Sequence, residues 1–475
     1  MKAEDQYIDL YEQCRDVICR HSSETMNGCR DAAFERFKAN GFPTRKVERY
    51  KYTDMQQLFI PDYGLNLNRL PIAVDPYKAF SCDVPNLSTS LFFMVNDSFY
   101  PVEHLAEEAE SAASPDSCAT TGGSMIHAVN AKLPEGVVIG SLVKNADFIG
   151  SYYNRLASKN ADSIADLNTM LAQDGLLVYV PRHTKVERAV QVINILKAPP
   201  RWGRAGEESL MVNRRVLIVL EEGAELKMLF CDHAADDHYF LTTQVIEVFV
   251  GDHASLDLYC LEETHNKNVR VSNVFIDQQR NSRVNHNVIT LHNGTTRNML
   301  DLTFSGEGAE CGCYGCVIAD KQQHVDNNTL ITHCAPHCTS NQLYKYVLDD
   351  KAIGAFAGKV LVKPGAQKTA SQMTNQNLTA TKEARMYTQP MLEIYADDVK
   401  CAHGSTVGQL NDAALFYMQQ RGISRQEARL LLQNAFINEV IDKMQLEPLR
   451  DRLHYLVEKR FRGELNKCKG CKLCR

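Results

Sequence analysis

The stretch QVIEVFVGDHASLDLYCL, Gln244 to Leu261, shows the pattern that decides the fold. It contains two short apolar runs rich in Val, Ile, Leu and Phe, and the turn-forming residues Gly251 and Asp252 stand between them. Short β-branched and aromatic runs bounded by Gly, Asp, Asn and Ser are typical of β-strands. The stretch therefore predicts two strands joined by a short turn.

The same pattern repeats from Leu176 to about residue 400. Its apolar runs are spaced about 8 to 15 residues apart, as in an all-β domain. No stretch between them has the helical periodicity that a βαβ fold would need. Because turn phrases such as EEGAELKM, GDHASLDL, NSRVNHNV, EGAECGCYG and DKAIGAFAG recur just before strand starts, we expect a stacked solenoid, a parallel β-helix, rather than a sandwich. The runs are LLVYVP, VQVINIL, VLIVLE, QVIEVFV, SLDLYCL, NVFID, HNVITL, CVIAD, NTLITH and KVLV.

Helical patterns flank this β region. The segment before it is mostly helical by pattern, with an amphipathic helix that ends near Gly41. After Gly408, Asn411 or Asp412 can cap a helix that Gly422 ends. We therefore expect a mainly β protein with a mostly helical domain over 1–165, a parallel β-helix over 166–405, a helical domain over 406–465 and a cysteine-rich tail over 466–475.

Two further helices are predicted after Gly422. Ser424 and Glu427 form a capping box, S-x-x-E, that opens a helix with one apolar stripe. Pro448 suits the start of the last helix, which ends near Gly463. The stripe contains Ala428, Leu431, Leu432, Ala435 and Phe436.

Composition narrows the class of protein. The chain has 475 residues, of which 44% are hydrophobic and 23% charged, as in soluble globular proteins. The net charge of -6 gives no reason to expect nucleic acid, which favours a basic surface. The N-terminus lacks a signal-peptide pattern and the apolar runs are too short to cross a bilayer, so we expect a cytoplasmic protein. In a reducing compartment, sixteen cysteines do not predict a disulfide framework.

The segment DDVKCAHGSTVGQL places Cys401 two residues before His403. In a strand, side chains two apart lie on the same face, so a thiol and an imidazole would be presented together. The pair could be a nucleophile and base, a metal-ligand pair, or a packed pair at a domain junction, which spacing alone favours. Thiolate and imidazole suit soft and borderline metals, including iron–sulfur assemblies. Two ligands do not complete a site, so others would have to come from elsewhere in the chain or from a partner.

Three further cysteine clusters are candidate metal sites. CGCYGC would place Cys311 and Cys313 on one strand face and Cys316 on the other, so we expect it to fill the solenoid interior. HCAPHC has a proline turn that could bring its side chains together around zinc or iron. The tail has C-x2-C-x2-C spacing, which indicates either metal capture or a reactive, flexible end. The candidate ligands are His333, Cys334, His337 and Cys338 in the turn, and Cys468, Cys471 and Cys474 in the tail.

The chain has none of the common catalytic signatures. It lacks a phosphate-binding G-x-x-x-x-G-K-[ST] loop, a G-x-G-x-x-G turn after a strand, a G-x-S-x-G elbow and an H-E-x-x-H helix. We therefore expect no enzymatic activity of its own.

Several long segments resemble the SufB/SufD family of iron–sulfur cluster assembly proteins, over most of the chain. They are GFPTRKVERYKYTDM, QHVDNNTLITH, SNQLYKYVLDDKAIGAFAGKVLV, AQKTASQMTNQNL and the long C-terminal run that begins PMLEIYADDVKCAHGSTVGQL. The CAHG at 401–404 favours the SufD branch over the SufB branch.

The resemblance implies a right-handed parallel β-helix between helical domains. It also implies a heterodimer with a SufB-like paralogue, docking of a SufC-like ATPase, and assembly of iron and persulfide sulfur into a cluster. His403 matches the family's histidine at the SufB–SufD interface, with Cys401 beside it. A reduced flavin, FAD, on the complex and a homodimer of the isolated chain remain open. The expected SufC-binding residues are Leu415, Phe416, Tyr417, Arg421, Gly422, Ala428, Leu432 and Phe436.

Two other functions compete with this role. A polysaccharide-active β-helix would need aromatic side chains to stack on sugars, and a single tryptophan argues against it. A stand-alone iron–sulfur scaffold or carrier would use the cysteine tail as its source of ligands.

Overall fold

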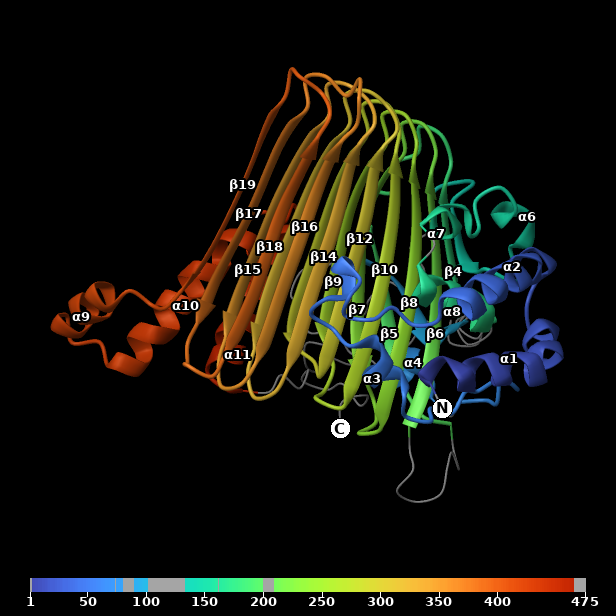
Figure 1. The fold of residues 1–475 in the computed structure, drawn as a ribbon, viewed down its shortest axis with the longest axis horizontal. Coiled ribbons are helices and arrows are strands. Elements are labelled where there is room, and N and C mark those ends of the chain that lie inside the picture. Colours follow the sequence, from blue (N-terminus) through green and yellow to red (C-terminus); the bar gives the residue numbers. More distant parts are fainter. Residues whose placement is uncertain are drawn as a thin grey trace, which may run out of the picture.

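The computed structural model describes residues 2–72, 74–79, 89–100, 133–160, 162–199 and 209–464. The protein is mainly β, with a parallel β-solenoid in the middle and helices at both ends of the sequence (Figure 1). This confirms the fold class that the repeated apolar runs predict. Within the described ranges, none of the helices combines the length and apolar character needed to cross a membrane.

The solenoid consists of two sheets, and successive strands from β4 to β19 alternate between them. The first sheet has the order β19-β17-β15-β13-β11-β9-β7-β5-β1-β2, and the second has the order β18-β16-β14-β12-β10-β8-β6-β4-β3. The strands of the first sheet are β1 Thr89–Val95, β2 Ser98–Tyr100, β5 Ala189–Leu196, β7 Glu225–Ala234, β9 Ser255–Glu263, β11 Arg283–His292, β13 Glu310–Ala319, β15 Thr339–Leu348, β17 Ala370–Thr379 and β19 Lys400–Gly408. Those of the second sheet are β3 Val138–Ser141, β4 Leu176–Val180, β6 Ser209–Leu220, β8 Tyr239–Val250, β10 Asn268–Gln278, β12 Thr295–Phe304, β14 His324–His333, β16 Ile353–Val362 and β18 Arg385–Ile394.

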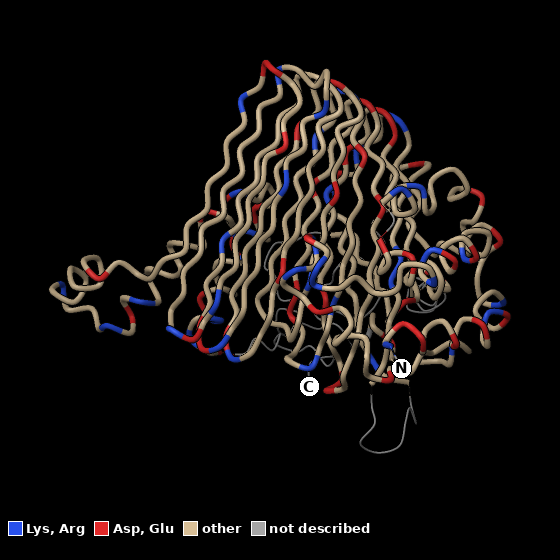
Figure 2. The backbone as a smooth tube through the Cα atoms, in the orientation of Figure 1, with Lys and Arg blue, Asp and Glu red and all other residues tan. Residues whose placement is uncertain are grey.

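Equivalent residues of successive turns lie side by side. Leu300 of β12, for example, pairs in parallel register with Val274 of β10 and with Thr329 of β14. Charged residues gather at many of the turns at the two ends of the strands (Figure 2). This stacking lets each turn cover the apolar faces of its neighbours, which a single turn could not bury alone.

The turn phrases that the sequence singled out form tight corners with left-handed backbone. Each phrase contains one residue with positive φ, a conformation that Gly, Asn and Asp adopt most readily. These residues are Gly223, His253, Asn281, Gly308 and Asp350, with φ of 66°, 59°, 53°, 71° and 48°. The prediction of a turn before each of these strands is therefore confirmed.

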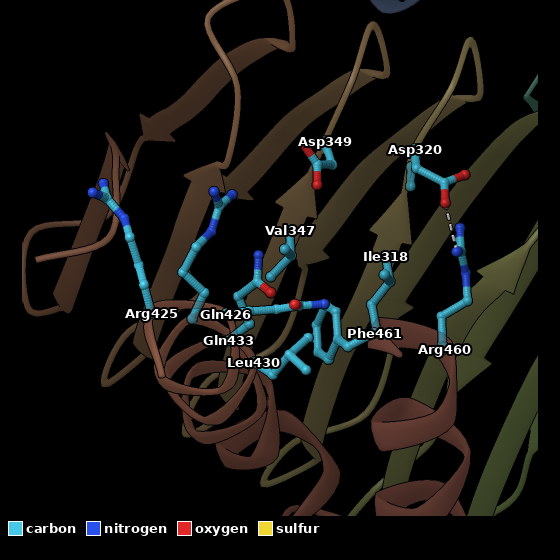
Figure 3. A pocket seen from close by; sticks show the side chains of 12 residues that line it. Ile318, Asp320, Val347, Asp349, Arg425, Gln426, Leu430, Gln433, Arg460 and Phe461 are labelled. Carbon is cyan, nitrogen blue, oxygen red and sulfur yellow. Dashed lines mark hydrogen bonds and ion pairs between the residues drawn. The ribbon is translucent and has the colours of Figure 1, made fainter. Parts of the chain in front are cut away.

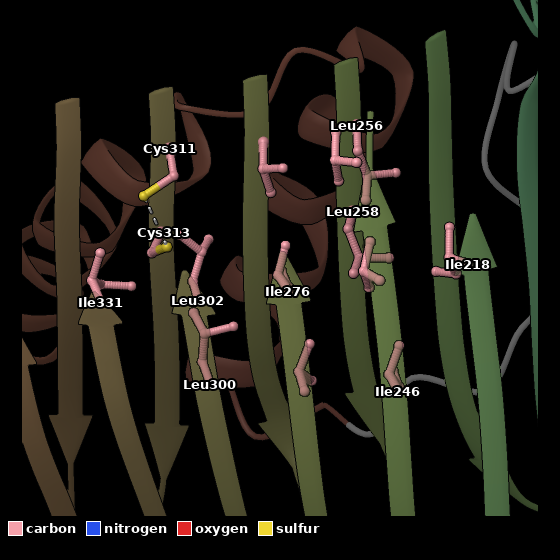
Figure 4. Packing of buried hydrophobic residues seen from close by; sticks show 14 of the residues in the cluster. Ile218, Ile246, Leu256, Leu258, Ile276, Leu300, Leu302, Cys311, Cys313 and Ile331 are labelled. Atoms are coloured by element: carbon pink, nitrogen blue, oxygen red, sulfur yellow. Dashed lines mark hydrogen bonds between the residues drawn. The ribbon is translucent and has the colours of Figure 1, made fainter. Parts of the chain in front are cut away.

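Alternate side chains fill a dry interior between the two sheets. In β10, Val274 and Ile276 point inward, whereas Val271 and Phe275 contact helices on the outer face. Figure 4 shows the interior row, in which Leu256 and Leu258 of β9 face Ile246 and Ile276. Parallel strands buried on both faces read as continuous apolar runs, which is the form that the strands take in the sequence.

The N-terminal helices cover the outer face of the second sheet. Phe34, Phe37 and Met170 pack there against Met211 and Leu241. The helices before the solenoid strands are α1 Ala3–Arg20, α2 Glu24–Asn40, the 3-10 helix η1 Glu48–Tyr50, α3 Met55–Phe59, α4 Pro76–Ala79, α6 Ala146–Ile149, α7 Arg155–Lys159 and α8 Ser163–Leu171. Of these, α4 lies instead against the first sheet, where the Tyr77 ring contacts Phe93 of β1.

The N-terminal segment also contributes strands, which the helical pattern did not predict. β1 pairs in parallel with β5 and so adds a strand to the first sheet, while β3 pairs antiparallel with β4. Every residue of β1 is buried. The run TSLFFMV is followed by a turn at Asn96 and Asp97, where Asn96 has φ of 55° and the chain returns antiparallel in β2, so the strand and its turn had a local signal that the helical interpretation of this segment passed over.

The C-terminal helices are α9 Asp412–Gln420, α10 Arg425–Ile441 and α11 Glu447–Phe461. Asn411 caps α9 by accepting from the amides of Ala413 and Ala414, and Ser424 caps α10 by accepting from the amide of Glu427. Both caps were predicted, since capping depends on neighbouring residues only. α10 and α11 pack on the outer face of the first sheet, and α9 projects beyond the solenoid (Figure 1).

Candidate functional site

The solenoid ends in two edge strands, β18 and β19, each of which is unpaired on its outer side. Each is the last strand of its sheet, so one row of backbone N–H and C=O groups faces away from the rest of the sheet. β19 is exposed along nearly its whole length. Large apolar side chains are also exposed on these strands or directly after them: Tyr387 39%, Ile394 39%, Tyr395 59% and Val407 49%. An exposed edge with apolar side chains is a surface suited to pairing with another sheet.

Cys401 and His403 lie on the edge strand β19. Cys401 pairs with Ser371 of β17 and His403 with Met373, whose side chain lies in the solenoid interior. Because residues two apart share a face, both side chains lie on the inner side of β19, at the mouth of the open end. Cys401 is half-buried against the interior core, and His403 is exposed. The structure thus confirms the shared strand face that the spacing predicted.

Burial raises the pKa of the Cys401 thiol above its ordinary value, and a backbone hydrogen bond from Ser371 acts in the opposite direction. The free chain therefore holds this sulfur as a thiol rather than as a thiolate. A metal or another cation at the mouth would favour the thiolate form that binds it.

A row of buried hydrogen bonds leads from β14 to the neighbour of Cys401. His333 Nε2 lies 3.0 Å from Ser340 Oγ, which donates to Ser371 Oγ at 2.8 Å. Ser371 is in turn the residue that pairs with Cys401 and hydrogen-bonds its thiol through the backbone. These contacts fix the strand segment that holds Cys401.

The HCAPHC turn does not bring its four side chains together. His333 is fully buried in the interior and Cys338 is buried with its thiol 3.4 Å from the Gly306 carbonyl. His337 takes a left-handed conformation at the turn, with φ of 59°, and its exposed ring lies 3.9 Å from Glu307. Cys334 is half-buried. Among the described residues, no group of three or more His, Cys, Asp or Glu side chains is arranged to hold a metal ion.

The CGCYGC segment lies in β13, and its cysteines occupy the two strand faces that the alternation of side chains predicted. Cys311 and Cys313 lie inside, with their sulfur atoms 4.0 Å apart (Figure 4), while Cys316 faces the C-terminal helices. Burial raises the pKa of Cys316 to about 12. Gly315 leaves room for the Tyr344 ring, because a Cβ there would lie 2.1 Å from that ring. These cysteines are packing residues in this structure.

The tail cysteines Cys468, Cys471 and Cys474 lie outside the described residues. Their metal-binding role stays a prediction.

The expected SufC-binding residues divide into exposed and buried sets. Phe416 and Tyr417 on α9 are 64% and 60% exposed, and the Arg421 guanidinium lies 5.3 Å from the Tyr417 ring centre. Gly422 has φ of 83° and ends the α9 turn. Leu415 and Ala428 are buried, and Leu432 and Phe436 are half-buried. Phe416, Tyr417 and Arg421, together with Gly422, are therefore the exposed part of this set, and the buried and half-buried residues support it.

Sequence patterns missed a chain of buried ion pairs inside the solenoid. Arg214 and Arg270 both contact Asp232, at 2.7 and 3.1 Å, and Arg270 also contacts Glu262 at 3.3 Å. The nearby arginine charges lower the pKa of Asp232 despite its burial. The sequence signal for this network was an arginine within an apolar strand, Arg214 in β6 and Arg270 in β10.

The fold and the open end define a class of protein: a parallel β-solenoid with helical layers on both outer faces and a thiol–imidazole pair on a free edge. Comparison with known proteins agrees with this class. Residues 203–436 match the model described as SUF system FeS cluster assembly, SufBD core domain, and residues 1–192 match the SufBD protein N-terminal region.

Individual relatives carry the same description. An iron–sulfur cluster assembly SufBD family protein of Synechocystis is 25% identical over 423 residues, covering 87% of this chain and 86% of that protein. The iron–sulfur cluster assembly protein SufD of Escherichia coli is 28% identical over 305 residues, covering 64% and 70%. SufD of Bacillus subtilis is 22% identical over 329 residues, covering 67% and 72%. The chain belongs to the SufB/SufD family of iron–sulfur cluster assembly proteins and is SufD-like.

Proposed function

We propose that this chain is a non-catalytic subunit of a scaffold complex on which iron–sulfur clusters are assembled. The observation that carries the proposal is the placement of Cys401 and His403 on the unpaired edge strand β19. A thiolate and an imidazole form an incomplete site, so a second chain docked along this edge would supply the remaining ligands. The partner expected from the family is a SufB-like paralogue, and the cargo is iron or a nascent cluster.

The open end suits such a partner. An edge strand from a second solenoid would satisfy the free backbone groups of β18 and β19 and cover Tyr395 and Val407. A second copy of this chain could use the same edge when the paralogue is absent. Any electron donor, such as reduced FAD, would belong to the assembled complex.

The C-terminal helices supply the second docking surface in this proposal. α9 projects beyond the solenoid (Figure 1). Its Phe416 and Tyr417 side chains are mostly exposed. Aromatic side chains of this kind often dominate the energetics of protein interfaces. A SufC-like ATPase bound there would couple ATP hydrolysis to the position of the open end.

Replacing His403 by alanine is expected to abolish cluster assembly without disrupting the complex. His403 is exposed, so its loss creates no cavity and should leave the fold intact. Loss of a metal ligand should have a large effect, because even replacing a residue that only hydrogen-bonds a ligand costs about 10–100-fold in metal affinity. The test is anaerobic reconstitution on the complex co-purified with SufB-like and SufC-like chains, with size-exclusion chromatography as the check on assembly.

The matched control is His337→Ala, which removes another exposed histidine away from the open edge. Wild-type cluster absorbance in His403→Ala, with an intact complex, would place the assembly site elsewhere.

The double change Phe416→Glu and Tyr417→Glu is expected to weaken binding of a SufC-like ATPase by about 2 kcal/mol or more, as for interface hot spots. Both side chains are mostly exposed, so folding should be unaffected. Isothermal titration with the ATPase measures the effect. Tyr455→Glu on α11, also exposed, is the control, and equal weakening by the control would show that α9 is not the docking surface.

A further inference from the structure

A groove of about 500 Å³ lies between the C-terminal helices and the first sheet, away from the open edge and from the exposed face of α9. This volume is within the range of small-molecule sites. Figure 3 shows its two walls, with Leu430 and Phe461 on the helices and Ile318 and Val347 on the strands. The lining also includes Ala319, Asp320, Asp349, Arg425, Gln426, Arg429, Gln433 and Arg460.

Two of the three arginines in the groove are not neutralised by carboxylates. Arg460 is paired, with its guanidinium 2.7 Å from Asp320. Arg429 donates only a long hydrogen bond of 3.4 Å to the Ala380 carbonyl. Over the described part of the chain, neither Arg425 nor Arg429 forms an ion pair. The groove therefore has two arginines, four residues apart on α10, that lack carboxylate partners, and guanidinium groups bind phosphate well.

A buried polar side chain also lines the groove. Gln433 is only 6% exposed, and its amide has no hydrogen-bond partner in the described part of the chain. The amide is not one of the fully buried polar groups that lack a partner, so it reaches the surface of the groove, where it is free to bond a ligand. At the strand side, Asp349 accepts from the Asp350 amide at 2.9 Å and offers its second carboxylate oxygen as an acceptor.

We propose that this groove binds a phosphate monoester carried on a flat ring with hydrogen-bond donors, which is the chemistry of a mononucleotide. Arg425 and Arg429 hold the phosphate. The ring lies between Phe461 and the strand residue Val347, and its edge bonds Gln433 and Asp349. The groove adjoins α10, so an occupied site would stiffen the junction between the C-terminal helices and the solenoid.

The test is isothermal titration of the full-length chain with AMP, adenosine and inorganic phosphate. AMP is expected to bind at sub-millimolar concentration. Adenosine and phosphate are each expected to bind at least about tenfold more weakly, because each keeps only half of the contacts. Equal binding of phosphate and AMP would overturn the role of the ring, and absence of AMP binding at millimolar concentration would overturn the proposal.

Charge-reversal variants locate the site. Arg425→Glu and Arg429→Glu are each expected to weaken AMP binding at least about tenfold. Lys443→Glu, just after α10 and outside the groove, makes the same charge change and should bind AMP like the wild type. Circular dichroism confirms that each variant is folded. AMP affinity unchanged in both arginine variants would place any binding elsewhere and refute the assignment.

Discussion

Glu247→Ala is expected to lower the free energy of unfolding by about 3–5 kcal/mol, as for removal of one partner of a buried ion pair. Glu247 lies on β8 with no exposed surface, and Arg215 Nη2 donates to its carboxylate at 2.6 Å. The alanine variant would leave the Arg215 guanidinium buried without its counter-charge, which is why the expected loss is large.

The same carboxylate also holds a helix. Glu247 accepts hydrogen bonds from the backbone amides of Asn154, Leu156 and Ala157 at 2.8, 2.8 and 3.1 Å. These amides open α7, where the helix dipole favours a negative charge. One side chain of the second sheet therefore caps an N-terminal helix, and its loss should loosen α7 as well as the ion pair.

Urea unfolding followed by circular dichroism measures the change. The control Glu187→Ala removes an exposed carboxylate, 76% accessible, and should stay within about 0.5 kcal/mol of the wild type. The double variant Arg215→Leu and Glu247→Leu removes both charges, so it should lose less than the two single variants together. A loss below about 1 kcal/mol for Glu247→Ala would mean that Arg215 finds other partners, such as Asn154.

The Arg215–Glu247 contact shows what the sequence could and could not predict. Glu247 lies inside the apolar run QVIEVFV and Arg215 directly precedes the run VLIVLE, and both runs were correctly predicted as strands, because strand character and turns depend on local residues. Their pairing depends on which turns of the solenoid stack, and they are 32 residues apart in the chain. No local pattern encodes that pairing. The helix caps at Asn411 and Ser424, by contrast, are local and were predicted correctly.

The candidate site likewise has features that the local sequence predicts and features that depend on how the solenoid stacks. The shared face of Cys401 and His403 follows from the two-residue period of a strand, so it was predictable. That β19 is the last strand of its sheet, with a free edge, depends on the chain turning into helices after Gly408 and on the stacking of earlier turns. The HCAPHC turn failed to gather its side chains because a left-handed residue at His337 turns that ring outward while His333 points inward.

Acidification from pH 7 to pH 5 is expected to cost about 2 kcal/mol of stability for each of two buried histidines, His286 and His333. Burial lowers the pKa of both imidazoles from 6.5 to about 4. His286 points into the solenoid interior beside Leu258 and Cys313, and neither ring nitrogen has a partner among the described residues. The neutral ring is therefore the form that the fold accepts.

The direction of this pH effect depends on whether the folded or the unfolded chain is protonated at the higher pH. In the unfolded chain each histidine protonates as the pH falls below about 6.5, whereas the folded chain resists until about pH 4. The stability that each buried, neutral histidine contributes is therefore fully present above pH 6.5. It is lost progressively as the pH falls and is gone below pH 4. Buried carboxylates with a raised pKa, such as Glu262, have the opposite effect and add stability as the pH falls. The dependence of wild-type stability on pH therefore does not isolate the effect of the histidines.

A variant comparison isolates the contribution of His286. His286→Leu keeps an apolar side chain of similar size in the interior, so its stability at pH 7 should lie within about 1 kcal/mol of the wild type. Between pH 7 and pH 5 it should lose about 2 kcal/mol less than the wild type, measured by urea unfolding at each pH. His337→Leu removes an exposed histidine and should keep the wild-type loss. Parallel pH profiles for His286→Leu and the wild type would mean that this imidazole accepts its proton in the folded chain, and that the interior opens to water before the solenoid unfolds.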